Sequence, residues 1–87
     1  MINEIVCVEW TDVLHRDDLT LSEVKQLKPV PAISYGKLLW MDDSRVVVVS
    51  TIFPDPDGDE YRDCSSIPRC LVTKLTKMEV KNEVSLD

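Results

Sequence analysis

The stretch Arg45–Phe53, with the sequence RVVVVSTIF, is the most apolar run in the chain and decides the fold class. Its four consecutive valines, with an isoleucine and a phenylalanine after them, would make both faces of an extended strand apolar. Such a strand lies in the centre of a sheet or is covered on both sides. The segment Pro54–Asp59 cannot continue the strand, and its Asp-Gly pair is a strong hairpin signal. The sequence therefore predicts a central strand that leads through a turn into a neighbouring strand.

Four more strands are expected around this one, because the remaining apolar residues alternate with a period of two. In Ala32–Met41, the alternation places Trp40 on the same face as Leu38. Pro68 forces a bend before the last strand, since it lacks the amide that a strand ladder needs. The four predicted strands are Ile2–Val13, Ala32–Met41, Glu60–Ile67 and Cys70–Val80.

A short helix is expected in the long first connection. Thr20 and Glu23 have the spacing of a capping box, in which each side chain satisfies a free amide of the other residue. Three apolar residues form one helical face, and Pro29 ends the helix after Lys28. The predicted helix, Thr20–Lys28, is about two turns long and needs a packing partner to be stable.

Together these elements predict a mainly β protein: a small five-stranded antiparallel barrel of the SH3-like or Sm-like kind, with one short helix in the first long loop. A sheet of five short strands must curl to bury its apolar residues, and Gly36 suits a sharp strand bend. The alternative architecture is a flat sheet with the helix packed across one face. We expect a single β-barrel domain over residues 1–81 and a flexible C-terminal tail over residues 82–87.

The composition argues against several classes of protein. Ten basic and 16 acidic residues give a net charge of −6, which disfavours direct binding to DNA or RNA polymers, because these attract a basic surface. No apolar run approaches the ~20 residues of a membrane-spanning helix, and no secretory signal opens the chain. Three cysteines, an odd number, indicate free thiols in a reducing cytoplasm.

The sequence offers no convincing catalytic or metal-binding group. His15 is the only histidine, and nothing pairs it with a serine or cysteine as base and nucleophile. The cysteine spacings do not match a structural zinc site. The acidic residues from Asp55 onward lack the glutamate that an EF-hand calcium loop has at position 12. We therefore expect a protein that is not an enzyme and that uses no metal or cofactor.

Short motifs along the chain resemble a recurring pattern in small, uncharacterised phage and prophage proteins. The pattern has V-x-W-x-D near the start, S-x-G-x-L in the second strand and I-P before the last strand. The residues that carry it are Val8-Glu9-Trp10-Thr11-Asp12, Ser34-Tyr35-Gly36-Lys37-Leu38, Asp42-Asp43 and Ile67-Pro68-Arg69. Many such proteins continue with a glycine where this chain has Cys70. The resemblance implies a phage or mobile-element origin and action in the host bacterial cytoplasm, and it implies no catalytic residue.

Two binding hypotheses follow. In the first, a non-enzymatic phage-type inhibitor sequesters a small anionic, nucleotide-like ligand or a host protein, and so counters host defence. Basic residues gather near the last strand, and the ligand-binding residues would be Arg62, Arg69, Lys74 and Trp40. A simpler interpretation of these basic residues is a solvated strand face that discourages edge pairing.

In the second hypothesis, the chain is an acidic mimic of nucleic acid that blocks a DNA- or RNA-binding host protein or a CRISPR protein. Its carboxylates would then occupy the channel in which the partner holds nucleic acid. The carboxylates in question belong to Asp42, Asp43, Asp55, Asp57, Asp59 and Glu60.

Self-association is also expected. The chain has more apolar residues than one small core can hold, and the predicted helix could cover only a few hundred Å² of them. The remainder would be buried against another copy of the chain through open strand edges, so the sequence predicts a homo-oligomer.

Overall fold

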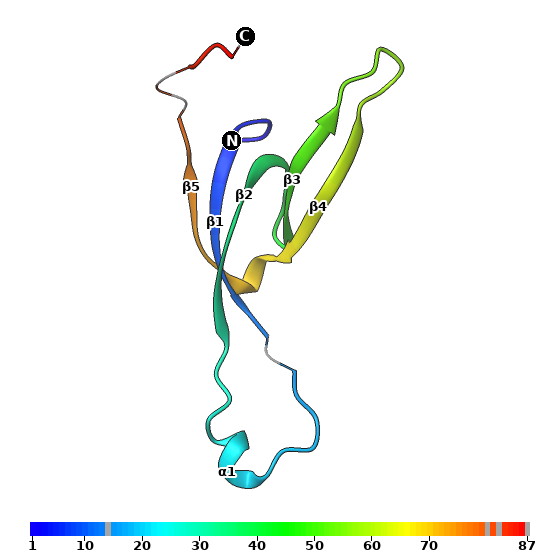
Figure 1. Ribbon diagram of the computed structural model, residues 1–87. Coiled ribbons are helices and arrows are strands. Elements are labelled where there is room, and N and C mark those ends of the chain that lie inside the picture. The colour runs from blue at the N-terminus through cyan, green and yellow to red at the C-terminus, as the bar shows by residue number, and fades with distance from the viewer. Residues whose placement is uncertain (14, 80, 82, 87) are drawn as a thin grey trace.

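The computed structural model describes residues 1–13, 15–79, 81 and 83–86. Within them, five strands form one antiparallel sheet in the order β4-β3-β2-β1-β5 (Figure 1). The mainly β class and the five antiparallel strands are thus confirmed. The elements are β1 (Ile5–Asp12), α1 (Leu21–Val24), β2 (Val30–Met41), β3 (Arg45–Phe53), β4 (Glu60–Pro68), the 3₁₀ helix η1 (Arg69–Leu71) and β5 (Val72–Lys77).

The strand boundaries differ from the predicted ones mainly in the first and last strands of the chain. β1 begins at Ile5 and not at Ile2, because Asn3 adopts a positive φ of 69° and turns the chain. Near the other end, η1 takes up Cys70 and its neighbours, so the last strand begins only at Val72. The expected end of that strand, at Val80, and the expected tail residues Asn82 and Asp87 lie outside the described residues.

One face of the sheet, which we call the inner face, carries the hydrophobic core. β3 lies between β2 and β4, as its apolar run predicts. Trp10 packs against the edge of the core, and its Nε1 donates a hydrogen bond to Ser34 Oγ at 3.0 Å. The buried residues of the core are Val6, Val8, Leu38, Val46, Val48 and Ile67.

A bulge in β2 changes the face on which Trp40 lies. Leu38 pairs with Val48, but after an irregularity in the register Trp40 pairs with Val47. Leu38 is fully buried, whereas Trp40 is 52% exposed. The prediction that these two residues share a face is therefore wrong, because a bulge adds one residue to the strand and reverses the alternation beyond it. Trp40 lies on the opposite face of the sheet, which we call the outer face.

Gly36 marks a close approach of β2 to β3. A Cβ atom at this position would lie 2.6 Å from the carbonyl oxygen of Val49, closer than side-chain and backbone atoms approach in folded proteins. The absence of a side chain therefore lets the two strands approach each other here, in line with the strand bend expected from the sequence.

The helix in the first connection is shorter than predicted. α1 is a single turn, and its capping box is present, with the Thr20 hydroxyl accepting from Glu23 N at 3.3 Å. All four of its residues are exposed, and it lies beyond the end of the sheet (Figure 1). A helix with no packing partner is marginal, so it ends at Val24 and not at Lys28. The alternative architecture is therefore wrong in packing the helix across one face, whereas the sheet itself is open, with β4 and β5 as its two edges.

β5, the last strand in the chain, pairs antiparallel with β1, the first. Val6 lies opposite Lys77 and Val8 lies opposite Leu75. The Thr73 hydroxyl adds a hydrogen bond to the main-chain oxygen of Glu9 at 3.0 Å. The first and last strands in the chain, β1 and β5, are thus neighbours in the sheet.

Two connections project from the sheet and make the molecule long. Its radius of gyration is 17.1 Å and its extents are 55 × 30 × 28 Å, whereas a compact domain of this length has a radius of gyration of about 12 Å. Residues 15–29, which we call the arm, extend from one end of the sheet, and the β3–β4 hairpin extends from the other (Figure 1). Both projections consist largely of exposed residues.

Candidate functional site

Two of the four predicted ligand-binding residues, Trp40 and Arg69, meet at the β2–β3 turn. Trp40 Nε1 donates a hydrogen bond to Asp42 Oδ2 at 2.8 Å, and Arg69 Nη1 donates one to the main-chain oxygen of Asp42 at 3.1 Å. The Arg69 amide also donates to the main-chain oxygen of Ser44 at 2.9 Å. These bonds fasten η1 to the turn.

Asp42 is the centre of this turn. Its Oδ1 accepts hydrogen bonds from the amide and the hydroxyl of Ser44, both at 2.8 Å, and from the Arg45 amide at 3.0 Å. The hydrogen bond from Trp40, together with those from Ser44 and Arg45, holds the pKa of the Asp42 carboxyl well below its ordinary value. The Asp42 carboxylate belongs to the same turn whose main-chain oxygen accepts from Arg69, and its fixed negative charge opposes the binding of a second anion there. The geometry therefore supports a structural role for this turn.

The other two predicted ligand-binding residues lie elsewhere. Arg62 is on β4 and Lys74 is on β5, and these strands are the two opposite edges of the sheet. The expectation that Arg62 lies beside the last strand is therefore wrong, because β5 pairs with β1 and not with the strand that precedes it. Lys74 lies opposite Glu9 in the ladder. The structure thus brings together two of the four residues.

Arg62 belongs to a cluster at the base of the hairpin tip. Its guanidinium carbon lies 4.5 Å from the centre of the Phe53 ring, and its Nε donates to Glu60 Oε1 at 2.9 Å. Phe53 is 47% exposed and Tyr61 is 46% exposed. Stacking and ion pairing therefore orient Arg62 across Phe53, and both aromatic rings remain accessible to a partner.

The hairpin tip, residues 54–60, presents four of the six acidic residues predicted for a protein interface. The Asp57 amide donates to Asp55 Oδ1 at 2.9 Å, and the Asp55 amide donates to Asp59 Oδ1 at 3.2 Å. A turn hydrogen bond joins Gly58 N to the Asp55 main-chain oxygen at 3.0 Å, and Gly58 has a φ of 134°. These local bonds hold the carboxylates of Asp55 and Asp59 in place, and Arg62 holds that of Glu60. The four residues are Asp55, Asp57, Asp59 and Glu60.

The remaining two acidic residues, Asp42 and Asp43, are separate from the tip. They lie in the β2–β3 turn, before the first residue of β3, whereas the tip follows its last residue. The six carboxylates therefore form two groups at opposite ends of one strand. Chain order alone predicts this separation, once the strand is recognised.

The outer face carries exposed apolar residues that the sequence did not bring together. Cys7 lies opposite Tyr35 on β1 and β2, and its electrostatic interaction and hydrogen bond raise the pKa of the Tyr35 phenol. Trp40 joins this surface only because of the bulge in β2. We call the set the outer apolar patch, and its members are Ile5, Cys7, Ile33, Tyr35 and Trp40.

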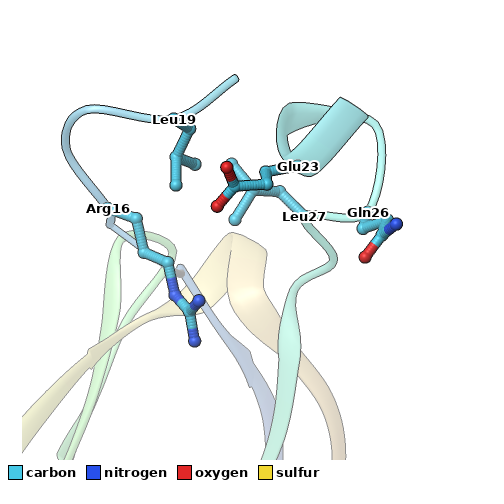
Figure 2. A pocket seen from close by; sticks show the side chains of 5 residues that line it. All are labelled: Arg16, Leu19, Glu23, Gln26 and Leu27. Atoms are coloured by element: carbon cyan, nitrogen blue, oxygen red, sulfur yellow. The ribbon is translucent and has the colours of Figure 1, made fainter. Parts of the chain in front are cut away.

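The arm holds a small surface hollow. It has a volume of about 210 Å³, and Figure 2 shows Leu19, Glu23 and Leu27 turned toward one another inside it. Arg16 and Gln26 complete its lining. This volume is below the roughly 300 Å³ at which pockets for small molecules begin, and the hollow consists only of arm residues. We therefore interpret the hollow as the packing of side chains within an exposed loop and not as a ligand site.

Within the described residues, no three His, Cys, Asp or Glu side chains gather in a way that could hold a metal ion. In that same part of the chain, no helix combines the length and apolar character needed to cross a membrane. Comparisons with protein-family models, with curated proteins and with solved structures gave no match for this chain.

Proposed function

We propose that this chain is a non-enzymatic binding protein of phage or mobile-element origin that uses its acidic hairpin tip to occupy a basic surface on a host protein. The observation that carries the proposal is the projection of the tip, residues 54–60, beyond the end of the sheet (Figure 1). Four carboxylates lie within these seven residues. Those of Asp55, Asp57 and Asp59 stand clear of the sheet, where a partner can reach them, and that of Glu60 pairs with Arg62.

The fixed geometry of the tip supports a role for its carboxylates in recognising a partner, beyond keeping the protein in solution. Asp55 and Asp59 accept hydrogen bonds from main-chain amides of the same tip. A preorganised loop loses less conformational entropy when it binds than a mobile one does. The tip therefore presents its charge in a form that a partner can match.

The aromatic residues at the base of the tip add a second kind of contact. Phe53 and Tyr61 are about half exposed, and Arg62 lies over the Phe53 ring. Tyrosine and arginine are enriched among the residues that dominate binding energy at protein interfaces, and aromatic residues in general are enriched there. An acidic tip with aromatic residues at its base fits a partner surface with basic residues around an apolar groove.

A basic groove on a host protein is most simply a nucleic-acid-binding surface, because such surfaces are recognised by clustered lysine and arginine. The proposal therefore joins two hypotheses from the sequence, capture of a host protein and acidic mimicry of nucleic acid. Binding would exclude the nucleic acid and so counter a host activity. The small-anion hypothesis receives less support, since Arg62, Lys74 and the Arg69 turn are separated in the sheet.

We also propose that the sheet is an SH3-like or Sm-like barrel. The strand order and the 3₁₀ helix directly before β5 support this assignment, and η1 contacts both β1 and β3. These contacts bend the chain from one end of the ladder toward the other. Nuclear Overhauser contacts between the edge strands β4 and β5 would support a closed barrel, and their absence would leave an open twisted sheet.

The proposed function is tested by neutralising the tip without changing its shape. Asparagine and glutamine keep the acceptor oxygens that form the turn, so the variant Asp55→Asn/Asp57→Asn/Asp59→Asn/Glu60→Gln should fold normally. We expect tagged wild-type protein to retain bacterial DNA- or RNA-binding proteins at 50 mM salt and to release them as salt or duplex DNA is added. The neutralised variant should retain at least tenfold less of them.

The matched control neutralises two acidic residues in the arm. Asp17→Asn/Asp18→Asn removes charge from another exposed segment, and it should leave capture unchanged. If the tip variant captures the same proteins as the wild type, or if duplex DNA does not compete, the proposed function is wrong.

A further inference from the structure

The outer apolar patch is a group of exposed apolar side chains on one face of the sheet. Its four large members are exposed by 44% for Ile5, 56% for Ile33, 58% for Tyr35 and 52% for Trp40. Three of them lie on β2, and Ile5 and Cys7 lie on the adjacent strand β1. α1 cannot shield them, because it lies beyond the end of the sheet (Figure 1).

The size of the patch indicates what could cover it. A large apolar or aromatic side chain has roughly 150–250 Å² of surface, so four half-exposed ones leave about 400 Å² on each copy. Two such surfaces face to face, with the polar residues around them, would bury about 1,000 Å² in total, which is the lower limit of specific protein interfaces. The patch is thus large enough for a weak dimer and too small for an obligate one.

The charged residues beside the patch, Lys37 and Glu9, have opposite signs, so they could pair between two copies of the chain. Lys37 follows Tyr35 by two residues on β2, and Glu9 follows Cys7 by two residues on β1. Because the strands are antiparallel, these charges lie at opposite ends of the Cys7–Tyr35 pair, with Lys37 opposite Ile5 and Glu9 opposite Ile33.

A two-fold axis that crosses both strands at the Cys7–Tyr35 pair would exchange the two ends of the patch. Lys37 of one copy would then lie diagonally across from Glu9 of the other, and the same contact would occur twice. An interface between two identical surfaces requires this kind of self-complementarity. Lys74 lies opposite Glu9 on β5 and adds a second positive charge beside it, so Glu9 would be held between two lysines.

We infer that the outer apolar patch is the contact surface of a face-to-face homodimer, with Cys7 and Tyr35 at the two-fold axis and Lys37–Glu9 ion pairs on either side. The inference differs from strand-edge pairing, because both edges of the sheet stay free. It is independent of the hairpin tip, so the dimer and the partner-binding activity can fail separately.

The first test measures the mass of the chain by sedimentation equilibrium between about 1 and 200 μM. We expect a reversible monomer–dimer equilibrium within this concentration range, because an interface near the lower size limit of specific interfaces fits a weak, transient dimer. Tyr35→Glu should raise the dissociation constant more than about tenfold, because it places two negative charges against each other at the axis. Tyr61→Glu changes another exposed tyrosine, 46% exposed and away from the patch, and should leave the dissociation constant unchanged.

The second test uses the charges, and it does not depend on how well Tyr35→Glu folds. Glu9→Lys and Lys37→Glu should each weaken the dimer, and the double variant should restore it, because the pair is exchanged. In a Cys64→Ser/Cys70→Ser background, a short bismaleimide should link Cys7 to Cys7 of the second copy at dimer concentrations. A wild-type chain that stays monomeric at 200 μM, a dimer that Tyr35→Glu leaves intact, or a double charge exchange that fails to restore it would overturn the inference.

Discussion

Both faces of the sheet carry large apolar side chains, but the hydrophobic core lies on the inner face. On the inner face, Val6, Leu38 and Val46 are fully buried. On the outer face, Ile33 and Tyr35 remain more than half exposed, although they lie on the same strand as Leu38. Hydrophobicity along a strand therefore does not determine which face becomes the core of a small sheet.

The difference comes from what the rest of the chain can cover. β5 brings Val72 and Leu75 against the inner face, whereas α1 projects beyond the sheet with all its residues exposed, so it does not cover the outer face. The inner face is thus a core made by chain topology, and the outer face leaves exposed the side chains that we propose as a dimer contact.

The largest effect is expected at the centre of the inner face. Leu38→Ala removes a fully buried side chain and should lower the free energy of unfolding by about 3 kcal/mol, through lost burial and the cavity that remains. Urea unfolding followed by far-UV circular dichroism measures this. A loss below about 1 kcal/mol would contradict the assignment of Leu38 to the core.

A smaller effect is expected at the close approach between β2 and β3. Gly36→Ala places a methyl group 2.6 Å from the main-chain oxygen of Val49, so the strands must move apart. Such overpacking typically costs about 1–3 kcal/mol. The same urea experiment measures it, and a variant as stable as the wild type would show that the two strands are not held this closely.

The Asp42 carboxylate, which accepts a hydrogen bond from Trp40 on the outer face, should make the protein less stable at acidic pH. Its hydrogen bonds lower its pKa in the folded state, so its contribution is complete above the unfolded pKa of about 3.9. That contribution is lost as pH falls toward the folded pKa. Thermal melts of wild type and Asp42→Asn at pH 7 and pH 2.5 should show a smaller decrease for the variant. Equal decreases would mean that the turn does not depend on the charge of Asp42.

The smallest effect on stability is expected on the outer face. Ile33→Ala removes a side chain that is 56% exposed and should change the free energy of unfolding by no more than about 0.5 kcal/mol in dilute solution. The same substitution should weaken self-association at high concentration. A loss comparable to that of Leu38→Ala, measured at 1 μM, would remove the distinction between the two faces.

Much of the sheet could be predicted from the sequence. The valine run indicated β3, the Asp-Gly turn indicated the β3–β4 hairpin, and the capping box indicated where α1 begins. These features act over a few residues, so local rules describe them. The predicted length of α1 was wrong, because a helix longer than one turn needs a packing partner to be stable. Local sequence rules do not show whether another part of the chain packs against it.

The arrangement of the candidate site was less predictable. Trp40 was assigned to the wrong face, because the bulge before it arises from the pairing of β2 with β3 and has no sequence signature of its own. Arg62 and Lys74 were placed together because neighbours in sequence usually become neighbours in a sheet. The pairing of β5 with β1 breaks that rule here.

That pairing also affects how the chain reaches its folded state. The hydrogen bond from Thr73 to Glu9 joins residues 64 positions apart, and the whole β1–β5 ladder closes a loop of this order. Proteins dominated by such distant contacts fold in milliseconds to seconds, whereas those with local contacts fold far faster. On the ribosome, β1 would wait with one edge open until β5 has been synthesised, and during that interval chaperones and other nascent chains have access to it.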